Sequence, residues 1–205
     1  MTPSPIVLAS GNAGKVKEIQ ALLNDQLILP QSAFSVPECE EIGGTFVENA
    51  ILKARNAATH CHLPAIADDS GLIVDALNGA PGVISARYAG IGASDLDNIN
   101  KLLAELESVG GQRTARFVCV IVFMEHAHDP LPIIAQGSWE GRILDHTEGE
   151  HGFGYDPVFW VPNFNCTAAQ LTTDVKNAIS HRGLALRQLA AAINMRPNAI
   201  LRVPE

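Results

Sequence analysis

The sequence predicts an α/β fold built on a mixed β-sheet. Strand-like and helical patterns alternate in the first half of the chain, beginning with the apolar run Ile6–Ala9 and a helical pattern from Lys15. From Arg116 to Val161, by contrast, strand-like runs follow one another directly. Alternation favours parallel strands joined by crossover helices, whereas clustered strands pair antiparallel. Because no internal repeat or linker divides it, we expect residues 1–205 to form one domain, with two lobes around a cleft.

The N-terminal elements follow from apolar spacing and helix caps. We expect a buried strand at Ile6–Ala9, then a glycine-rich loop, and a second short strand at Leu27–Leu29. The helix between them has an inner side formed by Val16, Ile19 and Leu23. Thr45 and Glu48 form a capping box for a helix that ends near His60. Its small inner face, which predicts close packing, consists of Ala50, Ala54, Ala57 and Ala58.

Two adjacent carboxylates, Asp68 and Asp69, separate the apolar runs Leu63–Ala67 and Leu72–Leu77. We therefore expect them to lie between two buried strands. Like charges this close repel, so the pair needs a cation, a shared proton or hydrogen-bond donors. A hard cation such as Mg²⁺ suits carboxylate oxygens and bridges to substrate phosphate. The alternative is a plain turn, because Asp-Asp-Ser-Gly is also good turn composition.

The remaining helices and strands are predicted from β-branched runs, helix caps and helix-breaking residues. Ser94 caps a helix that Gly110 ends, and its inner side is expected to be Leu96, Ile99, Leu103 and Leu106. The expected strands are Arg116–Met124, Pro132–Trp139, Gly141–Leu144 and Val158–Val161, with a turn separating the second from the third. Helices are expected at Thr167–Gln170 and at Ser180–Asn194, the latter with Leu184, Leu189 and Ile193 inward. Residues 196–205 are expected to form a loose tail.

Composition limits the classes of function. With 47% hydrophobic and 18% charged residues the chain is globular, and a net charge of −8 argues against a general nucleic-acid binder. No apolar run of about 18 residues occurs, so no membrane span is expected, and we see no secretory signal before the first strand. The 4 cysteines are scattered, which favours a reducing, cytoplasmic setting. Successive residues of a helix point apart, so we do not expect His60-Cys61-His62 to bind zinc.

The stretch Ser10-Gly-Asn-Ala-Gly-Lys15 has the chemistry of a phosphate site. A glycine-rich turn between a strand and a helix presents backbone N–H groups and the positive end of the helix dipole. The stretch is not a Walker A sequence, because its spacing is shorter and Val16 replaces the hydroxyl residue that would bind the metal. An ordinary turn is the alternative.

Further groups have side chains suited to a nucleotide. An acidic cluster lies within residues 38–41, and Lys53 follows on the next helix. The loop Gly152–Pro157 places aromatics between glycines, which suits stacking on a flat ring. Lys176 and the segment Ser180–Gly183 add cations and a histidine. Each group has a structural alternative: a solvated loop, a surface lysine, a buried turn or a helix cap. Together they predict a nucleoside triphosphate hydrolase.

Six motifs in chain order resemble the inosine/xanthosine triphosphate pyrophosphatase family, which removes non-standard purine nucleotides. The motifs lie in Ser10–Lys15, Thr45–Arg55, Leu63–Leu72, Gly79–Gly90, Gly152–Pro157 and Lys176–Gly183. The resemblance implies Mg²⁺-dependent hydrolysis of ITP, XTP and their deoxy forms to the monophosphate and pyrophosphate, with Mn²⁺ as a substitute metal. It also implies an elongated fold with a long mixed sheet and a cleft between two lobes. The expected partners are a nucleotide and a second copy of the chain, with neither nucleic acid nor membrane.

The resemblance also implies roles for individual residues. Asp69 is the expected proton acceptor and a metal ligand, with further metal ligands among Asp68, Glu40 and Glu41. The triphosphate is expected to be held by Lys53 and by Ser10, Gly11, Asn12, Ala13, Gly14 and Lys15. Ser70 is expected to contact substrate beside the catalytic carboxylate. The base is expected to be recognised by Phe153, Gly154, Tyr155, Asp156, Lys176, His181 and Arg182.

Several alternatives stay open. Ile42 stands where the resemblance implies a small polar residue, which leaves the choice between Glu40 and Glu41 undecided. Specificity is expected from donors to the 6-oxo group of the base, supplied by backbone N–H groups near residues 153–156 with His181 or Arg182. A non-catalytic purine-nucleotide sensor and a Maf-like pyrophosphatase for other modified nucleotides are the competing functions. A serine hydrolase is not expected, because no nucleophile elbow is present.

Overall fold

The chain folds into two compact units, each assembled from separate stretches of sequence. The computed structural model describes residues 5–11, 16, 19–20, 23 and 26–195. Unit 1 comprises Met1–Asp69, Cys119–Gly137 and Arg182–Glu205, and unit 2 comprises Ser70–Val118 and Ser138–His181. Three long strands contribute residues to both units: β3 (Ala65–Val74), β4 (Thr114–Met124) and β5 (Ile133–Ile143). The division therefore falls within strands and not in a linker.

The strands form one sheet of seven in the order β2-β1-β3-β4-β5-β6-β7. The shorter strands are β1 (Ile6–Leu8), β2 (Ile28–Pro30), β6 (Phe159–Val161) and β7 (Cys166–Thr167). Strand β1 pairs in parallel with β2 and β3, whereas β6 pairs antiparallel with β5 and β7. The predicted mixed α/β class is therefore confirmed.

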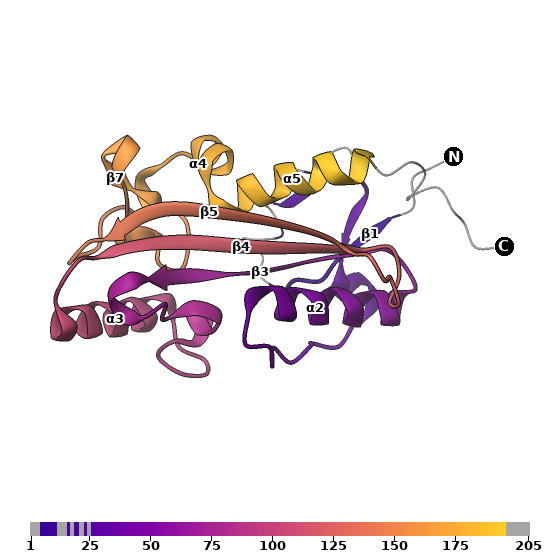
Figure 1. Ribbon diagram of the computed structural model, residues 1–205, viewed down its shortest axis with the longest axis horizontal. Coiled ribbons are helices and arrows are strands. Elements are labelled where there is room, and N and C mark those ends of the chain that lie inside the picture. The colour runs from indigo at the N-terminus through magenta and orange to yellow at the C-terminus, as the bar shows by residue number, and fades with distance from the viewer. Residues whose placement is uncertain (1–4, 12–15, 17–18, 21–22, 24–25, 196–205) are drawn as a thin grey trace. The chain divides into compact units, whose positions relative to one another are not determined.

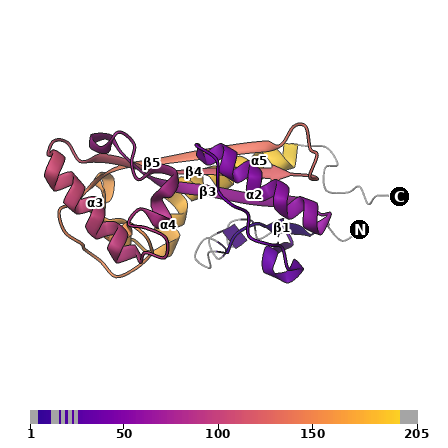
Figure 2. The ribbon, with the colours of Figure 1, turned by 90° about the horizontal axis from the view of Figure 1, so that it is seen from below.

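Helices cover the sheet. Among the described residues the α-helices are α2 (Phe46–Cys61), α3 (Asp95–Val109), α4 (Thr173–Ile179) and α5 (His181–Met195). Short 3-10 helices are η1 (Gln31–Phe34), η2 (Asp75–Leu77), η3 (Gly82–Arg87), η4 (Asp156–Val158), η5 (Pro162–Phe164) and η6 (Ala168–Gln170). In unit 1, α2 and α5 lie on opposite faces of the strands (Figure 1), and α2 runs roughly along β3 when seen from below (Figure 2). None of the described helices is long and apolar enough to cross a bilayer.

Side chains of the unit 1 strands alternate between these two faces. Ile66 of β3 and Ile121 of β4 pack in the core that includes α5. Ala67 and Val122, one residue further along each strand, pack instead against the buried alanines of α2. Because successive strand residues point to opposite sides, this period of two assigns a face to every β3 position in unit 1. The predicted close packing of the alanine face is confirmed.

The aspartate-containing stretch differs from its prediction. Asp68 and Asp69 were expected between two strands, but both lie within the single strand β3. The prediction was wrong because it assumed that two adjacent charges would interrupt the ladder. In the structure each charge faces its own cation, so the extended backbone continues through them.

The expected turn between Trp139 and Gly141 is likewise absent, and β5 runs unbroken. A Cβ at Gly141 would lie 2.5 Å from the carbonyl oxygen of Trp160 on β6. The glycine therefore marks the close approach of a neighbouring strand, and a side chain there would displace it.

The helix predictions are largely confirmed. Thr45 and Ser94 cap α2 and α3 with complete capping boxes. Leu96 is wrong as an inward residue, because it is 60% exposed while Leu102 is fully buried, so the apolar stripe of α3 begins after the first turn. Helix α4 was not expected. Most of the helix expected from Lys15, and the tail over residues 196–205, lie outside the described residues, although Ile19 and Leu23 are buried as expected.

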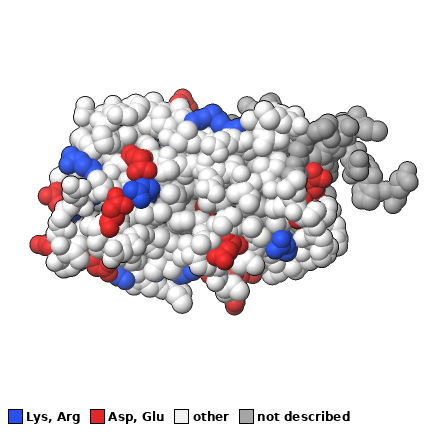
Figure 3. Space-filling view, in the orientation of Figure 1, with Lys and Arg blue, Asp and Glu red and all other residues white. Residues whose placement is uncertain are grey.

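The face drawn in Figure 3 shows acidic and basic side chains scattered singly or in small mixed groups. The described residues on this face form no continuous basic area. This distribution agrees with the net charge of −8. On this face, then, the described residues offer no basic surface of the kind that nucleic-acid binding requires.

Candidate active site

The two adjacent aspartates point to opposite faces of β3. Asp69 continues the α2 side of the strand, and Asp68 continues the α5 side. Asp68 Oδ2 lies 3.5 Å from a guanidinium nitrogen of Arg182, in the first turn of α5, and Asp69 Oδ1 accepts a hydrogen bond of 3.0 Å from Lys53 Nζ on α2. Both carboxylates are at most 5% exposed, so each needs such a partner to remain charged.

Lys53 joins Asp69 to the acidic segment that precedes α2. Its ammonium donates to Glu41 Oε1 at 2.9 Å and to Asp69 Oδ1 at 3.0 Å. Burial opposes the charge, but the attraction of Asp68 and Asp69 and the hydrogen bond to Glu41 outweigh it, and the pKa of Lys53 is raised above its usual value. Lys53 therefore stays protonated at neutral pH. Glu40, the other candidate, is exposed.

The donor set on the α2 side suits a hard cation. Glu41 and Asp69 each place a carboxylate oxygen within 3.0 Å of one positive charge, the Lys53 ammonium. Mg²⁺ commonly takes one or two carboxylates and fills its remaining positions with water and substrate phosphate. Among the described residues no group of three or more histidine, cysteine or acidic side chains forms a cluster that could hold a metal ion alone. The geometry thus brings Glu41 and Asp69 together and directs Asp68 to the other face.

The start of the expected phosphate loop follows β1, the neighbour of β3 in the sheet. Leu8 of β1 pairs with Ile66 of β3, and the Ala9 amide donates to the Ile66 carbonyl at 2.8 Å. The Ser10 amide then donates to the Leu8 carbonyl at 3.0 Å, just after β1 ends. Ser10 and Gly11 line a cavity of about 540 Å³ within unit 1, together with Pro30, Gln31 and Glu38 among others. Asn12, Ala13, Gly14 and Lys15 lie outside the described residues.

In unit 2, the expected base-binding loop is fastened by carboxylates. The Phe153 amide donates to Asp156 Oδ2 at 2.9 Å, and the Gly154 amide donates to Asp95 Oδ2, at the start of α3, at 2.6 Å. The Asp156 amide donates to the Phe153 carbonyl at 3.3 Å. These three amides therefore already have acceptors within the protein. Any donation from them to a 6-oxo group would require those hydrogen bonds to be exchanged.

The side chains of this loop are also held. Tyr155 is buried, and its hydroxyl donates to the Ser85 carbonyl at 2.9 Å. Burial, together with the nearby Tyr88 and Asp95, raises the pKa of Tyr155, so the hydroxyl remains a donor. Ser85 Oγ in turn accepts a hydrogen bond of 2.9 Å from the Leu72 amide of β3. Ser85 thus links the loop to β3, two residues after Ser70.

A buried cation and a flat ring meet at the same loop. Lys176 Nζ on α4 donates to Asp156 Oδ2 at 2.5 Å and lies 5.0 Å from the centroid of the Phe153 ring. His181, at the start of α5, stacks on Phe117 with centroids 5.0 Å apart and rings 14° from parallel. Trp139 lies beyond at 6.4 Å from His181. Unit 2 therefore gathers cationic, aromatic and imidazole groups of the kind that recognise a heterocyclic base.

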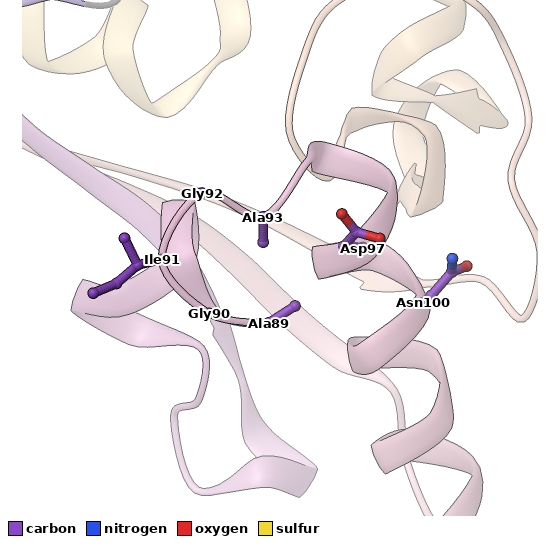
Figure 4. Close-up of a pocket in the computed structure, with 7 residues that line it drawn as sticks. All are labelled: Ala89, Gly90, Ile91, Gly92, Ala93, Asp97 and Asn100. Atoms are coloured by element: carbon purple, nitrogen blue, oxygen red, sulfur yellow. The ribbon is translucent and has the colours of Figure 1, made fainter.

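A second cavity, which lies in unit 2, is lined by few side chains suited to catalysis or binding. It measures about 430 Å³ and is lined by the loop Ala89–Ala93 with Asp97 and Asn100 of α3. Figure 4 shows the Ile91 side chain pointing away from those two polar residues. The Asp97 carboxylate already accepts the Ser94 amide and hydroxyl of the capping box. None of the residues predicted for the site lies here.

Sequence reasoning missed several residues that hold the predicted ones. Asn49 donates to Asp69, Asp95 accepts from Gly154, and Phe117 and Trp139 stack on His181. Only Asn49 had a local signal, because it precedes Lys53 by one helical turn on the same face. The others are brought in by tertiary contacts between distant segments.

The sequence matches the Ham1 family over residues 6–192. With a match of this extent, the chain belongs to the Ham1 family, and the resemblance inferred from the six motifs is confirmed.

The chain is 60% identical over 196 residues to a dITP/XTP pyrophosphatase of Idiomarina loihiensis, covering 92% of this chain and 97% of that protein. It is 61% identical over 187 residues to a dITP/XTP pyrophosphatase of Thioalkalivibrio sulfidiphilus, covering 90% and 95%.

Solved structures show the same fold. A HAM1 protein of Coxiella burnetii superposes with a TM-score of 0.89 at 54% identity, covering 94% of this chain and all of that one (100%). The Ham1 protein of Staphylococcus aureus gives 0.84 at 44% identity, covering 93% and 98%.

Proposed function

We propose that this protein hydrolyses dITP, ITP, XTP and dXTP to the nucleoside monophosphate and pyrophosphate, and so removes non-standard purines from the nucleotide pool. The observation that carries the proposal is the partly buried Glu41–Lys53–Asp69 group, in which two carboxylates converge on one ammonium. A sensor that only bound nucleotide would have no need for such a group. The near full-length similarity to relatives named dITP/XTP pyrophosphatases supports the same reaction.

In this reaction Asp69 takes the proton from the attacking water. The water forms a new bond to the α-phosphorus, the bond from that phosphorus to the bridging oxygen breaks, and pyrophosphate leaves. Asp69 is suited to the role because Lys53 and Asn49 hold both of its oxygens, which fixes the direction of its lone pairs. Lys53 and the Ser10–Lys15 segment neutralise charge on the phosphates.

A divalent cation, Mg²⁺ with Mn²⁺ as a substitute, belongs to the proposal. Glu41 and Asp69 would hold it, and Glu40 and Asp68 are less suited, because one is exposed and the other faces Arg182. When bound, such a cation would neutralise charge on the reacting phosphates.

Recognition of the base is assigned to the side chains of unit 2. Phe153 offers its ring for stacking, and Lys176 and His181 offer donors to the 6-oxo group. Because the amides of Phe153 and Gly154 have acceptors within the protein, side-chain donors are the better choice. Adenine carries an amino group at this position and would leave those donors unpaired, which disfavours ATP and dATP.

The test is pyrophosphate release from dITP, XTP, GTP and ATP with Mg²⁺, before and after addition of EDTA. We expect turnover of dITP and XTP, little of ATP, and none after chelation. Lys53→Met should abolish turnover, while Lys101→Met, at an exposed lysine of α3, should not. Tight dITP binding without turnover would favour the sensor, and preference for modified pyrimidine nucleotides would favour a Maf-like enzyme.

A homodimer and a cytoplasmic location complete the proposal. The cysteines are free thiols, which suits a reducing compartment. Light scattering on the purified protein tests the dimer, and fractionation of cells that produce it tests the location.

A further inference from the structure

Asn49 is a fully buried polar residue on α2 whose carboxamide is engaged at both ends. Its exposed fraction is 0%. Its Oδ1 accepts a hydrogen bond of 2.8 Å from the Gly43 amide, and its Nδ2 donates to Asp69 Oδ2 at 3.3 Å. A buried amide that found only one partner would destabilise the fold. Asn49 therefore fits its surroundings only while both neighbours keep their places.

The orientation of this carboxamide follows from the chemistry of its neighbours. A backbone N–H can only donate, so the Asn49 oxygen must face Gly43. The Asn49 nitrogen then faces Asp69, which as a carboxylate can only accept. Asp69 is thus held by two donors one helical turn apart on α2, Asn49 at Oδ2 and Lys53 at Oδ1. Two such bonds fix the plane of the carboxylate, which a single bond would leave free to rotate.

The same amide also holds the acidic segment in place. Gly43 lies two residues after Glu41, whose carboxylate meets Asp69 at the Lys53 ammonium. A Cβ at Gly43 would lie 2.7 Å from Asn49 Oδ1 and 2.7 Å from Glu48 Cβ, so only glycine allows this approach. Asn49 therefore connects the backbone beside Glu41 to the carboxylate of Asp69.

We propose that Asn49 is a positioning residue for hydrolysis, which aligns Asp69 with the acidic segment through its two hydrogen bonds. The proposal rests on the proposed function. Neither an apolar residue nor an acidic one can replace the amide. Alanine loses both bonds, and aspartate keeps an acceptor for Gly43 but turns a second carboxylate towards Asp69.

The experiment compares Asn49→Asp and Asn49→Ala with a matched control, Asn98→Ala. Asn98 is a buried asparagine of α3 that likewise bridges two backbone groups, the Ala89 amide and the Ala86 carbonyl. Two readouts are taken: kcat and KM with dITP, and hydrogen exchange of the Gly43 amide in the protein without nucleotide or metal. Thermal unfolding of each variant reports on folding.

The two Asn49 variants should distinguish the effect of the hydrogen bond to Gly43 from that of the hydrogen bond to Asp69. In Asn49→Asp, Gly43 should keep its protection from exchange while kcat falls about 10²-fold, the effect expected of a misplaced catalytic group. In Asn49→Ala, kcat should fall similarly and Gly43 protection should be lost. KM should change little in both. Asn98→Ala should lower stability and leave kcat and Gly43 protection close to wild type.

Wild-type kcat in Asn49→Asp, or an equal fall in Asn98→Ala, would overturn the positioning role. Unchanged Gly43 protection in Asn49→Ala would overturn the bridge itself. Failure of the proposed function is distinguishable, because it appears as absence of turnover in the wild-type protein, and the exchange readout does not depend on turnover.

Discussion

Unit 1 and unit 2 each contain a buried aspartate paired with a lysine, but the two carboxylates have different neighbours. Asp69 accepts hydrogen bonds from two side chains of α2, Lys53 and Asn49. Asp156 accepts from Lys176 and also from the Phe153 amide, three residues before it in the same loop. Asp69 is thus held by side chains of a different element, whereas Asp156 accepts a hydrogen bond from the backbone of its own loop.

The difference suggests two roles for a buried aspartate–lysine pair. One pair can position a catalytic group, and the other can stabilise the conformation of a loop. Replacing Asp69 affects two side chains of α2, of which Lys53 keeps its hydrogen bond to Glu41. Replacing Asp156 removes the acceptor of a loop amide and leaves a buried ammonium with one partner fewer. We therefore expect Asp69 variants to lose rate and Asp156 variants to lose stability.

The largest effect is expected for Asp69→Asn. The amide cannot take a proton from water, so kcat for dITP should fall by about 10²–10⁴ from loss of the base alone. The urea midpoint should fall less than in the Asp156 variant, because Lys53 keeps its hydrogen bond to Glu41. Steady-state kinetics and urea unfolding on one preparation check both statements. Near wild-type turnover would refute the role of Asp69 as the base.

For Asp156→Asn we expect the main effect on stability and not on the rate of hydrolysis. Removing one partner of a buried ion pair costs about 3–5 kcal/mol, and Lys176 and Asp156 are 11% and 4% exposed. Urea unfolding measures the loss, and dITP kinetics should show a raised KM. Asp75→Asn, which removes a partner from the exposed pair with Arg116, is the control and should leave stability nearly unchanged. Equal losses of stability in the two variants would show that burial of the Lys176–Asp156 pair adds nothing to its contribution.

A smaller effect is expected for Tyr155→Phe. This substitution removes one hydroxyl, and with it the hydrogen bond to the Ser85 carbonyl, at a cost of about 1 kcal/mol. If the bond aligns the loop, KM for dITP should rise while kcat stays constant. A fall in kcat without a change in KM would mean that Tyr155 acts on the reacting groups and not on the loop.

The smallest effect concerns His146 on the surface of unit 2. Hydrogen bonds to Asp145 and then Glu148 raise the pKa of His146 above 6.5. A raised folded-state pKa stabilises the protein below the unfolded value, and this contribution disappears as the pH rises through the folded value. NMR titration of the imidazole should show the raised pKa, and Asp145→Asn with Glu148→Gln should return it towards 6.5. An unshifted imidazole in the wild type would show that the contacts do not persist in solution.

Local signals predicted much of the fold. The capping boxes at Thr45 and Ser94, the buried alanines of α2 and the β4 strand depend on neighbours in sequence, and each was found from spacing alone. The continuity of β3 and β5 was missed for the opposite reason. Asp69 stays in a strand because of Lys53 on another element, and Gly141 stays in one because β6 approaches it closely.

The candidate site likewise contains residues that local motifs predict and residues that only tertiary contacts bring together. Lys53 and Asp69 could be found from motifs, but the pairing of Asp68 with Arg182 joins residues more than a hundred positions apart. Asp95 was seen only as part of a helix start, yet its carboxylate accepts from Gly154. Such partners depend on the register of the sheet and the placement of helices, which apolar periodicity does not specify. The roles proposed for the site residues stay predictions until the variants are measured.

The alternation of Asp68 and Asp69 across β3 has a consequence for how this gene can change. Substitutions elsewhere in the strand alter one side chain at a time, but a single-codon insertion or deletion between Pro64 and Asp68 would invert the strand's pattern. After a deletion Asp69 would be directed towards Arg182 and Ser70 would face Lys53, and after an insertion Asp68 would face Lys53. The length of this stretch is therefore under stricter constraint than its composition, and a deletion scan should find β3 far less tolerant than the loop at residues 126–132.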